Sequence, residues 1–356
     1  MTDYAIRPFE AGDAGAFLSL YETVFGAERS EEWFAWKYER NPYVDHVPIL
    51  LATDGESVVG ARSFFALGVA RDGDAVTALQ PCDAMVHPDH RRRGLFTRMT
   101  ERAIERYSGT YPFMFNFPNE ASLPGDLKLG WEVVAERETY YRIENPGAVA
   151  AAETDRASAA VAGRLAAPIA GLYYRVFGDG PAPSPAVSVR RVEGVASAEL
   201  AALYRRAVPE ERHAVRDERF YEWRFDNPDW AYTTYVAEAD GGPEAAVLVG
   251  RSTGPEPTKV MLTDVVPLRD PPERALVALV DRVLDDYSGA DMFCAPPQVL
   301  PERVLDAFGF RSDATYPLSA VTDAATHVAR SLGERGGPGL TDPDEWLLTF
   351  AELDGT

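Results

Sequence analysis

Apolar positions along the first part of the chain switch between the two-residue period of strands and the three-to-four-residue period of helices. Turn-forming residues separate these stretches. The predicted elements are a strand over Tyr4–Arg7, a helix capped by Asp13, a helix from Ser30 to Tyr38, strands over Pro48–Ala52, Ser57–Ala66 and Ala75–Val86, a helix over Gly94–Ser108, a strand over Phe113–Phe117, a short helix to Leu129 and a last hairpin over Trp131–Ile143. This order predicts a mixed α/β fold.

The second half of the chain repeats landmarks of the first half in the same order. Trp36 and the Asn-Pro pair that follows it return at Trp223, and a Gly–aromatic pair at residues 130–131 returns at 309–310. The offsets of the four matched landmarks are 183, 187, 180 and 179 residues. A period this long indicates two copies of one domain rather than a solenoid.

Proline- and glycine-rich stretches divide the chain between these copies. We expect a first domain over residues 1–145, an Ala/Pro-rich linker over 146–185 with a helical stretch over 149–166, a second domain over 186–325 and a C-terminal tail over 326–356. Residues 345–350 of the tail read as a short strand that pairs across the domains.

The composition excludes several classes of protein. The hydrophobic fraction of 46% is enough for proper cores, so the chain is not a disordered protein. Cys82 and Cys294 are far apart, which excludes a zinc site built on paired cysteines, and we expect no bound metal. No apolar run approaches the ~18 residues of a membrane span. The N-terminus lacks the pattern of a signal peptide, so we expect a cytoplasmic protein.

Charge is the most unusual feature of the composition. The formal net charge is −21, and only three of the 35 basic residues are lysine. A chain this acidic repels nucleic-acid phosphates and anionic membranes, so we expect neither as a partner. An acidic, lysine-poor surface is typical of a halophilic cytoplasm, where salt screens self-repulsion. An acidic protein from a GC-rich genome is the alternative.

The candidate chemistry lies where a predicted strand ends and a helix begins. Residues 86–97 read VHPDHRRRGLFT, with three consecutive arginines before Gly94. A helix N-terminus presents free N–H groups and the positive end of the helix dipole, and glycine lets the backbone approach an anion closely. The pattern indicates a site for a polyanionic ligand, with a solvated basic turn as the alternative.

This stretch resembles the phosphate-binding signature of the GNAT acetyltransferases. In that family V-x-P ends a strand, and R/Q-x-x-G-x-G/A opens the helix that binds the acetyl-CoA pyrophosphate. Residues 86–88 and 91–96 match, except that Phe96 replaces a small residue. A second family signature, an Asn leading a helix that ends in Gly–aromatic, is matched by Asn119 and residues 130–131.

The resemblance covers residues 4–143 and, more weakly, 187–320, so it implies two tandem GNAT-like domains. It implies that Asn119 hydrogen-bonds the pantetheine arm. The residues that we expect to bind acetyl-CoA are Met85, Val86, Arg91, Arg92, Arg93, Gly94, Leu95, Phe96, Thr97, Asn119 and Ser122.

Two departures from the family concern catalysis. Many members carry a Tyr that acts as general acid toward the CoA thiolate, whereas the matching residue here is Asp126, with Tyr111 and Tyr140 as alternatives. The general base that deprotonates the acceptor amine is not specified by a motif. Asp83 and Glu120 are the candidates, although Asp264 occupies the place of Asp83 in the second copy, which favours a structural role for Asp83.

The second copy lacks the phosphate-binding signature. Residues 271–274, Pro-Pro-Glu-Arg, stand opposite the loop, and Gln298 stands opposite Asn119. Prolines have no N–H to donate, and the Glu273 carboxylate repels phosphate. We therefore expect the second copy to keep the fold without the cofactor, as a scaffold or a wall of the acceptor pocket.

The sequence predicts an acetyl-CoA-dependent N-acetyltransferase that acts on a small-molecule or protein amine by direct attack in a ternary complex. A non-catalytic acyl-CoA-binding or regulatory protein is the first alternative. A transferase with another acyl donor is the second. The sequence leaves the oligomeric state and the identity of the amine open.

Overall fold

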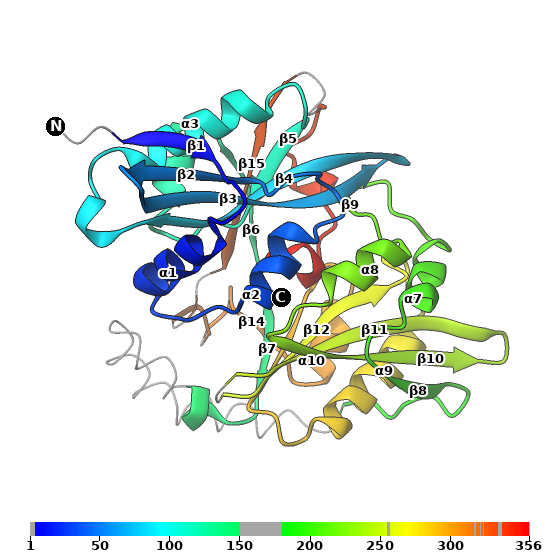
Figure 1. The fold of residues 1–356 in the computed structure, drawn as a ribbon. Coiled ribbons are helices and arrows are strands. Elements are labelled where there is room, and N and C mark those ends of the chain that lie inside the picture. The colour runs from blue at the N-terminus through cyan, green and yellow to red at the C-terminus, as the bar shows by residue number, and fades with distance from the viewer. Residues whose placement is uncertain are drawn as a thin grey trace.

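The computed structural model describes residues 4–149, 180–254, 257–316, 318–320, 322, 324–333 and 337–355, and it contains two β-sheets (Figure 1). The elements of the first half are β1 (Ala5–Pro8), α1 (Ala14–Phe25), α2 (Glu31–Phe34), a π-helical turn η1 (Ala35–Glu39), β2 (Ile49–Asp54), β3 (Ser57–Arg71), β4 (Asp74–Val86), η2 (Pro88–His90), α3 (Leu95–Tyr107), β5 (Phe113–Asn116), α4 (Leu123–Lys128), β6 (Glu132–Arg137) and β7 (Tyr140–Ile143).

The second half follows a similar succession of elements. They are β8 (Ser188–Glu193), α7 (Ser197–Tyr204), β9 (His213–Ala214), α8 (Glu218–Arg224), β10 (Trp230–Ala239), β11 (Gly242–Ser252), β12 (Lys259–Val266), α9 (Glu273–Asp286), β13 (Met292–Ala295), α10 (Glu302–Ala307), β14 (Arg311–Ser312), η3 (Leu318–Ala320), β15 (Ala325–Ser331), η5 (Pro343–Glu345) and η6 (Phe350–Glu352). The helical stretch expected over 149–166 lies outside the described residues, apart from Val149.

The two helix caps predicted in the first half differ in outcome. Ser30 caps α2 as predicted, because its hydroxyl oxygen accepts a hydrogen bond from the Trp33 N–H at 3.1 Å. Asp13 precedes α1, but its side chain does not cap the helix. Its carboxylate instead accepts hydrogen bonds from Arg7 at 2.7 and 2.8 Å. A charged partner within reach has therefore replaced the cap.

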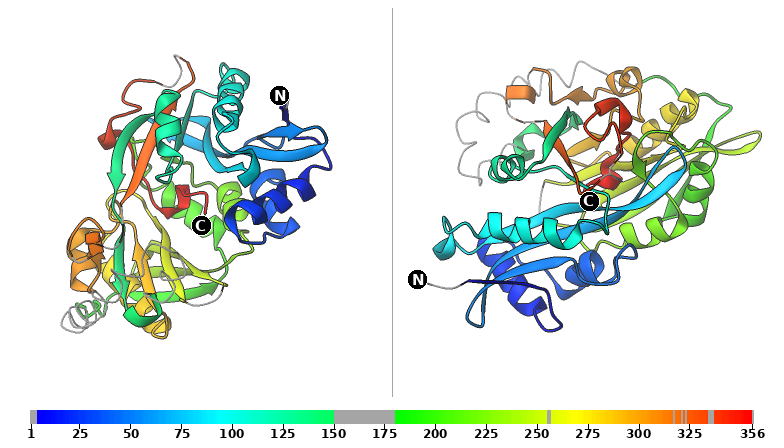
Figure 2. Two further views of the ribbon diagram at one scale, coloured as in Figure 1. Left: turned by 90° about the vertical axis from the view of Figure 1, so that its left-hand side faces the viewer. Right: turned by 90° about the horizontal axis from the view of Figure 1, so that it is seen from above.

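Alternation along β3 places helices on opposite faces of the first sheet. Phe64 and Ala66 are buried in one cluster with Tyr107 of α3. Phe65 belongs to a second cluster with Phe17 of α1 and with apolar residues of the second half. Successive side chains of a strand point to opposite faces. The α1 face of the first sheet therefore adjoins the second half of the chain (Figure 2).

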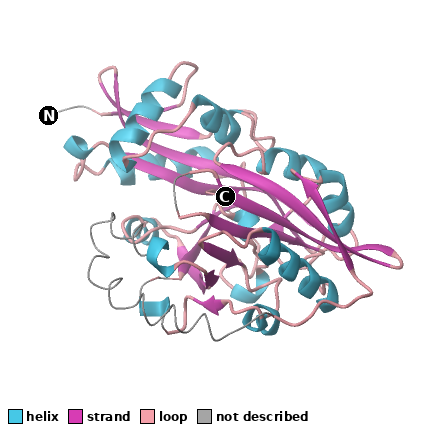
Figure 3. Cartoon of the chain, turned by 90° about the horizontal axis from the view of Figure 1, so that it is seen from below, coloured by secondary structure: helices cyan, strands magenta, loops and turns pink. Residues whose placement is uncertain are grey.

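The strands form two sheets (Figure 3), and the two have equivalent strand orders. The second sheet contains β7 from the first half of the chain, and the first sheet contains β15 and the short β9 from the second half. The first runs β1-β2-β3-β4-β5-β15-β6, with β9 paired to β3, and the second runs β8-β10-β11-β12-β13-β7-β14. The prediction of a hairpin over Trp131–Ile143 is therefore wrong, because β6 pairs with β15 while β7 pairs with β13 and β14. The apolar pattern specifies a strand but not its partner.

Reciprocal hydrogen bonds join the two halves on the α1 side. The indole N–H of Trp36 donates to the Trp223 carbonyl at 2.8 Å, and that of Trp223 donates to the Trp36 carbonyl at 3.0 Å. The repeated tryptophans thus meet each other across the interface. The predicted tail strand over 345–350 is reduced to one bridge between Trp346 and Arg212. Within the described residues, no helix combines the length and apolarity required to cross a bilayer.

Candidate active site

The loop between β4 and α3 presents free backbone N–H groups at a helix start. After the short η2 turn, Arg92 and Gly94 both adopt left-handed backbone conformations, with φ of 60° and 73°. The first backbone bond into α3 is donated by Arg98 to the Gly94 carbonyl at 3.0 Å. The N–H groups of residues 95–97 consequently lack acceptors within the helix, which is the arrangement that binds phosphate groups.

The three arginines of this loop have different surroundings, although all are exposed. Arg91 donates from Nε to the Val86 carbonyl at 3.2 Å. Arg93 donates to the Asp89 carbonyl at 3.0 Å and to the hydroxyl of Tyr4. Arg92 has no recorded partner among the described residues. Arg91 and Arg93 therefore brace the loop, while the charge of Arg92 is available to an anion.

β4 and β5 diverge as β4 approaches the loop between β4 and α3. β4 and β5 are parallel and pair only at Leu79 and Met114. Beyond that pair, the edge of β4 that faces β5 has no strand partner in the described chain, although β4 continues to Val86. Met85 is buried, with 1% of its surface exposed. This edge could pair with the amides of an extended ligand.

The Asn119 side chain stands at the start of the turn that leads into α4. Its Oδ1 accepts hydrogen bonds from the N–H and the hydroxyl of Ser122, both at 3.0 Å. The amide NH₂ of the exposed Asn119 has no hydrogen-bond partner among the described residues and can donate to a ligand. Glu120 is also exposed, and no described residue pairs with its carboxylate. Ser122 therefore holds Asn119 in place rather than facing a ligand through its hydroxyl.

Asp126, at the position of the family's Tyr, is fully buried in an ion pair. It accepts a hydrogen bond from Arg62 at 2.8 Å and one from the Asn116 amide at 3.3 Å. Burial lowers the pKa of the Arg62 guanidinium, and the Asp126 charge opposes that shift. Asp126 thus balances the buried charge of Arg62.

The unusual Phe96 belongs to the same cluster. Its ring lies 4.9 Å from the Arg62 guanidinium carbon and packs directly on Gly125. A Cβ at position 125 would lie 2.6 Å from the ring. The absence of a side chain at Gly125 therefore provides the space that the large Phe96 ring occupies.

Asp83 lies in a bulge of β4, where the register with β3 shifts, and its φ is 40°. Its Oδ2 accepts hydrogen bonds from the Lys37 ammonium at 2.7 Å and from the Tyr38 hydroxyl. Lys37 also contacts Asp354 of the C-terminal segment at 3.0 Å. Burial opposes the charge of Lys37, but Asp354 and Asp83 raise its pKa above the ordinary value.

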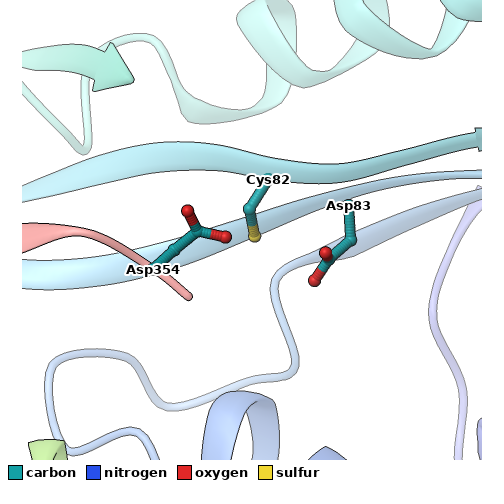
Figure 4. Close-up of side chains that lie close together, drawn as sticks. All are labelled: Cys82, Asp83 and Asp354. Carbon is teal, nitrogen blue, oxygen red and sulfur yellow. The ribbon is translucent and has the colours of Figure 1, made fainter. Parts of the chain in front are cut away.

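Cys82, Asp83 and Asp354 lie close together and face one another (Figure 4). Their ligand atoms are within 4.8 Å of one another, which is the spacing of a possible metal site. The Lys37 ammonium already supplies a cation to both carboxylates. Burial raises the pKa of the Cys82 thiol well above its ordinary value, so the sulfur is a poor ligand and a poor nucleophile.

The two alternative tyrosines are placed differently. Tyr111 is buried against Tyr107 of α3 and borders an open depression of about 610 Å³ together with Tyr43. Tyr140 belongs to β7 and therefore to the second sheet. Lys37, Arg62 and Asp354 were not among the sequence candidates. The rarity of lysine in this chain is the signal that could have identified Lys37.

The second half has no counterpart of the phosphate loop at its equivalent helix. α9 begins at Glu273, directly after Pro272. Arg303 donates to the Glu273 carboxylate from Nε at 2.7 Å, and Arg274 pairs with Glu244 at 3.1 Å. The arginines near this helix start are thus neutralised by carboxylates of the chain itself.

Comparisons with known proteins agree with this geometry. Residues 5–134 match the family model of the acetyltransferase (GNAT) domain. The sequence has no significant match among curated proteins. A probable N-acyltransferase of Enterococcus faecalis V583, described as a conserved protein of unknown function, is 11% identical, with 94% of this chain and 74% of that chain covered and a TM-score of 0.63.

Two further solved structures are similar over the same span. The GCN5-related N-acetyltransferase of Anabaena variabilis is 11% identical, with 93% and 73% of the two chains covered and a TM-score of 0.61. Eis1 of Mycobacterium abscessus is 17% identical, with 93% and 74% covered and a TM-score of 0.53. At these identities the likeness concerns the fold. Residues 5–134 therefore match the GNAT domain, and the chain shares its fold with these solved structures.

Proposed function

We propose that this protein is an N-acetyltransferase that binds acetyl-CoA through the loop between β4 and α3. The observation that carries the proposal is the run of acceptor-free N–H groups behind Gly94, beside the unpartnered Arg92. The pyrophosphate would accept hydrogen bonds from these groups. The edge of β4 at residues 85–86, which has no strand partner on the β5 side in the described chain, and the amide of Asn119 would hold the pantetheine arm.

The proposed reaction is direct acetyl transfer in a ternary complex. The amine nitrogen attacks the thioester carbonyl, an N–C bond forms, the C–S bond breaks, and the CoA thiolate leaves and takes up a proton. A base must remove a proton from the amine. Glu120 is free to do so, whereas Oδ2 of Asp83 is occupied by Lys37 and Tyr38.

The two candidate bases are distinguished by matched amide variants. If Glu120 is the base, Glu120→Gln lowers kcat at neutral pH and removes the acidic limb of the pH–rate profile. If Asp83 is structural, Asp83→Asn lowers the melting temperature and leaves the shape of that profile intact. Unchanged kinetics in Glu120→Gln would eliminate Glu120 as the base.

A non-catalytic acyl-CoA-binding protein is the second candidate. The observation that favours it is the ion pair of Asp126, which occupies the position of the family's acid. Turnover of acetyl-CoA, measured as thiol release with a panel of small amines and protein amines, separates the two. Release above the amine-free rate, lost in Arg92→Glu and retained in Arg274→Glu, supports the enzyme. Binding without release for any amine supports the binding protein, and release only with other acyl-CoA donors supports a different acyl group.

We propose that residues 1–145 and 186–325 are tandem GNAT-like domains joined by the linker over 146–185 and followed by a tail over 326–356. The first of these segments lends β7 to the second sheet, and β15 at the start of the tail completes the first sheet. The second domain serves as a scaffold or a wall of the acceptor pocket. The protein works in the cytoplasm, in a halophilic setting, on a small-molecule or protein amine and without a metal, nucleic acid or membrane partner.

A further inference from the structure

The C-terminal segment crosses the second sheet where β12 and β13 separate. β12 and β13 are parallel and pair over residues 259–261 and 292–294, after which β12 continues to Val266. β4 and β5 of the first sheet part in the same way. The red segment at the C-terminus lies between the two sheets in Figures 1 and 2. The segment is therefore placed at the counterpart of the opening that the proposed function assigns to the pantetheine arm.

Gln298 holds the backbone of this segment. Its Nε2 donates to the Trp346 carbonyl at 2.9 Å, and its Oε1 accepts from the Leu348 N–H at 2.8 Å. Gln298 precedes Gly309 by the same number of residues as Asn119 precedes Gly130. The two amide side chains thus hold equivalent positions, and Gln298 already binds a peptide backbone.

The other edge of the same segment is also paired. The Glu345 carbonyl accepts from the Arg212 N–H at 2.7 Å, and the Leu347 N–H donates to the Arg212 carbonyl at 3.0 Å. Trp346 is extended, with φ of −130° and ψ of 126°. Residues 346–348 therefore follow the η5 turn as an extended, amide-bearing chain between Arg212 and Gln298. A pantetheine arm has the same chemical character.

The next residues bury the segment against β12. The hydroxyl of Thr349 donates to Asp264 of β12 at 2.9 Å, and Phe350 packs in a cluster with Met261 and Cys294. The Glu352 carboxylate pairs with Arg216, and all four polar groups of this network have at most 3% of their surface exposed. A displaced segment would leave the Arg216 charge partly unpaired in the interior, which is costly.

We infer that the C-terminal segment over residues 345–352 is an intramolecular ligand that permanently occupies the second copy's groove for an extended amide-bearing ligand. The comparison with the pantetheine arm rests on the proposed function. The position of the segment against the second sheet follows independently from the hydrogen bonds of Gln298, Thr349 and Glu352. The second sheet therefore cannot accept a second acyl-CoA, quite apart from its lack of a phosphate loop.

The test compares Gln298→Ala with its matched control Asn119→Ala in the full chain. Backbone hydrogen exchange of residues 345–352 and calorimetric titration with acetyl-CoA are measured for both. Gln298→Ala should speed exchange at the Leu348 amide about tenfold and leave the affinity for acetyl-CoA within about twofold of wild type. Asn119→Ala should weaken acetyl-CoA binding several-fold and leave that exchange unchanged.

Unaltered exchange at Leu348 in Gln298→Ala would overturn the inference, as would faster exchange of the segment when acetyl-CoA is added to the wild type. If Gln298→Ala does not fold, Thr349→Val removes the Thr349–Asp264 bond with little change of shape and should speed exchange at residues 349–352. Failure of acetyl-CoA to bind the wild type would refute only the proposed function. The exchange data would still test whether residues 345–352 are held against the second sheet.

Discussion

Replacing Asp126 by Asn tests whether this residue balances a buried charge or acts on the substrate. The substitution keeps the shape of the side chain but removes the counter-charge of Arg62, which has 2% of its surface exposed. Breaking a buried ion pair by removing one partner costs ~3–5 kcal/mol. We expect the lower end, about 3 kcal/mol, because the Asn oxygen still accepts from Arg62 at the place where Asp126 accepts at 2.8 Å.

The assay is chemical denaturation of wild type and Asp126→Asn, with Arg62→Met/Asp126→Leu as the matched control. The control replaces both charges by apolar side chains of similar size, and Leu305 occupies the place of Asp126 in the second half. Such replacements are often neutral or stabilising, so the double variant should recover most of the lost free energy of unfolding. If Asp126→Asn were as stable as the wild type but lost turnover, Asp126 would take part in the reaction, and its assignment as the counter-charge of Arg62 would be wrong.

Three further predictions concern stability. Burial lowers the pKa of His213 from 6.5 to about 4, so the unfolded state binds more protons than the folded state between these pH values. The free energy of unfolding should therefore fall by about 3 kcal/mol as the pH falls from 6.5 to 4. His213→Gln should lose this pH dependence, and the half-exposed control His46→Gln should keep it. Gly125→Leu should lower the melting temperature by several degrees, because its Cβ would lie 2.6 Å from the Phe96 ring, and Phe96→Ala/Gly125→Leu should restore part of the loss in differential scanning fluorimetry. Raising KCl from ~0.1 M to ~2 M should raise the melting temperature markedly by screening the net charge of −21, and a flat response would contradict the halophilic interpretation.

The local features of the fold could be predicted from the sequence. The helix that starts behind Gly94, the strand before it and the cap at Ser30 depend on residues that are neighbours in the chain. The mixed α/β fold class is confirmed, and the family model matches residues 5–134, within the stretch over 4–143 that resembles the GNAT acetyltransferases. These features share one cause, because hydrophobic period, turn residues and capping side chains act over a few residues.

The choice of partners across the chain could not be predicted. The exchange of β7 and β15 between the sheets satisfies the same backbone groups as two hairpins would, so the pattern of Tyr140–Ile143 does not reveal its sheet. Lys37 pairs with both Asp83 and Asp354, and Asp354 lies more than 300 positions from Lys37 in the sequence. The predicted Asp13 cap is wrong because the Arg7 guanidinium, six residues earlier, competes for the same carboxylate.

Calorimetric titration of acetyl-CoA into the intact chain measures directly whether the first sheet alone binds the cofactor. The first sheet has the acceptor-free helix start and the unpartnered Arg92, while α9 begins after a proline at Glu273. We expect one site per chain, with binding weakened at least tenfold in Arg92→Glu, abolished in Gly94→Glu and unchanged in Arg274→Glu. A stoichiometry of two, or binding that survives in Gly94→Glu, would contradict this expectation.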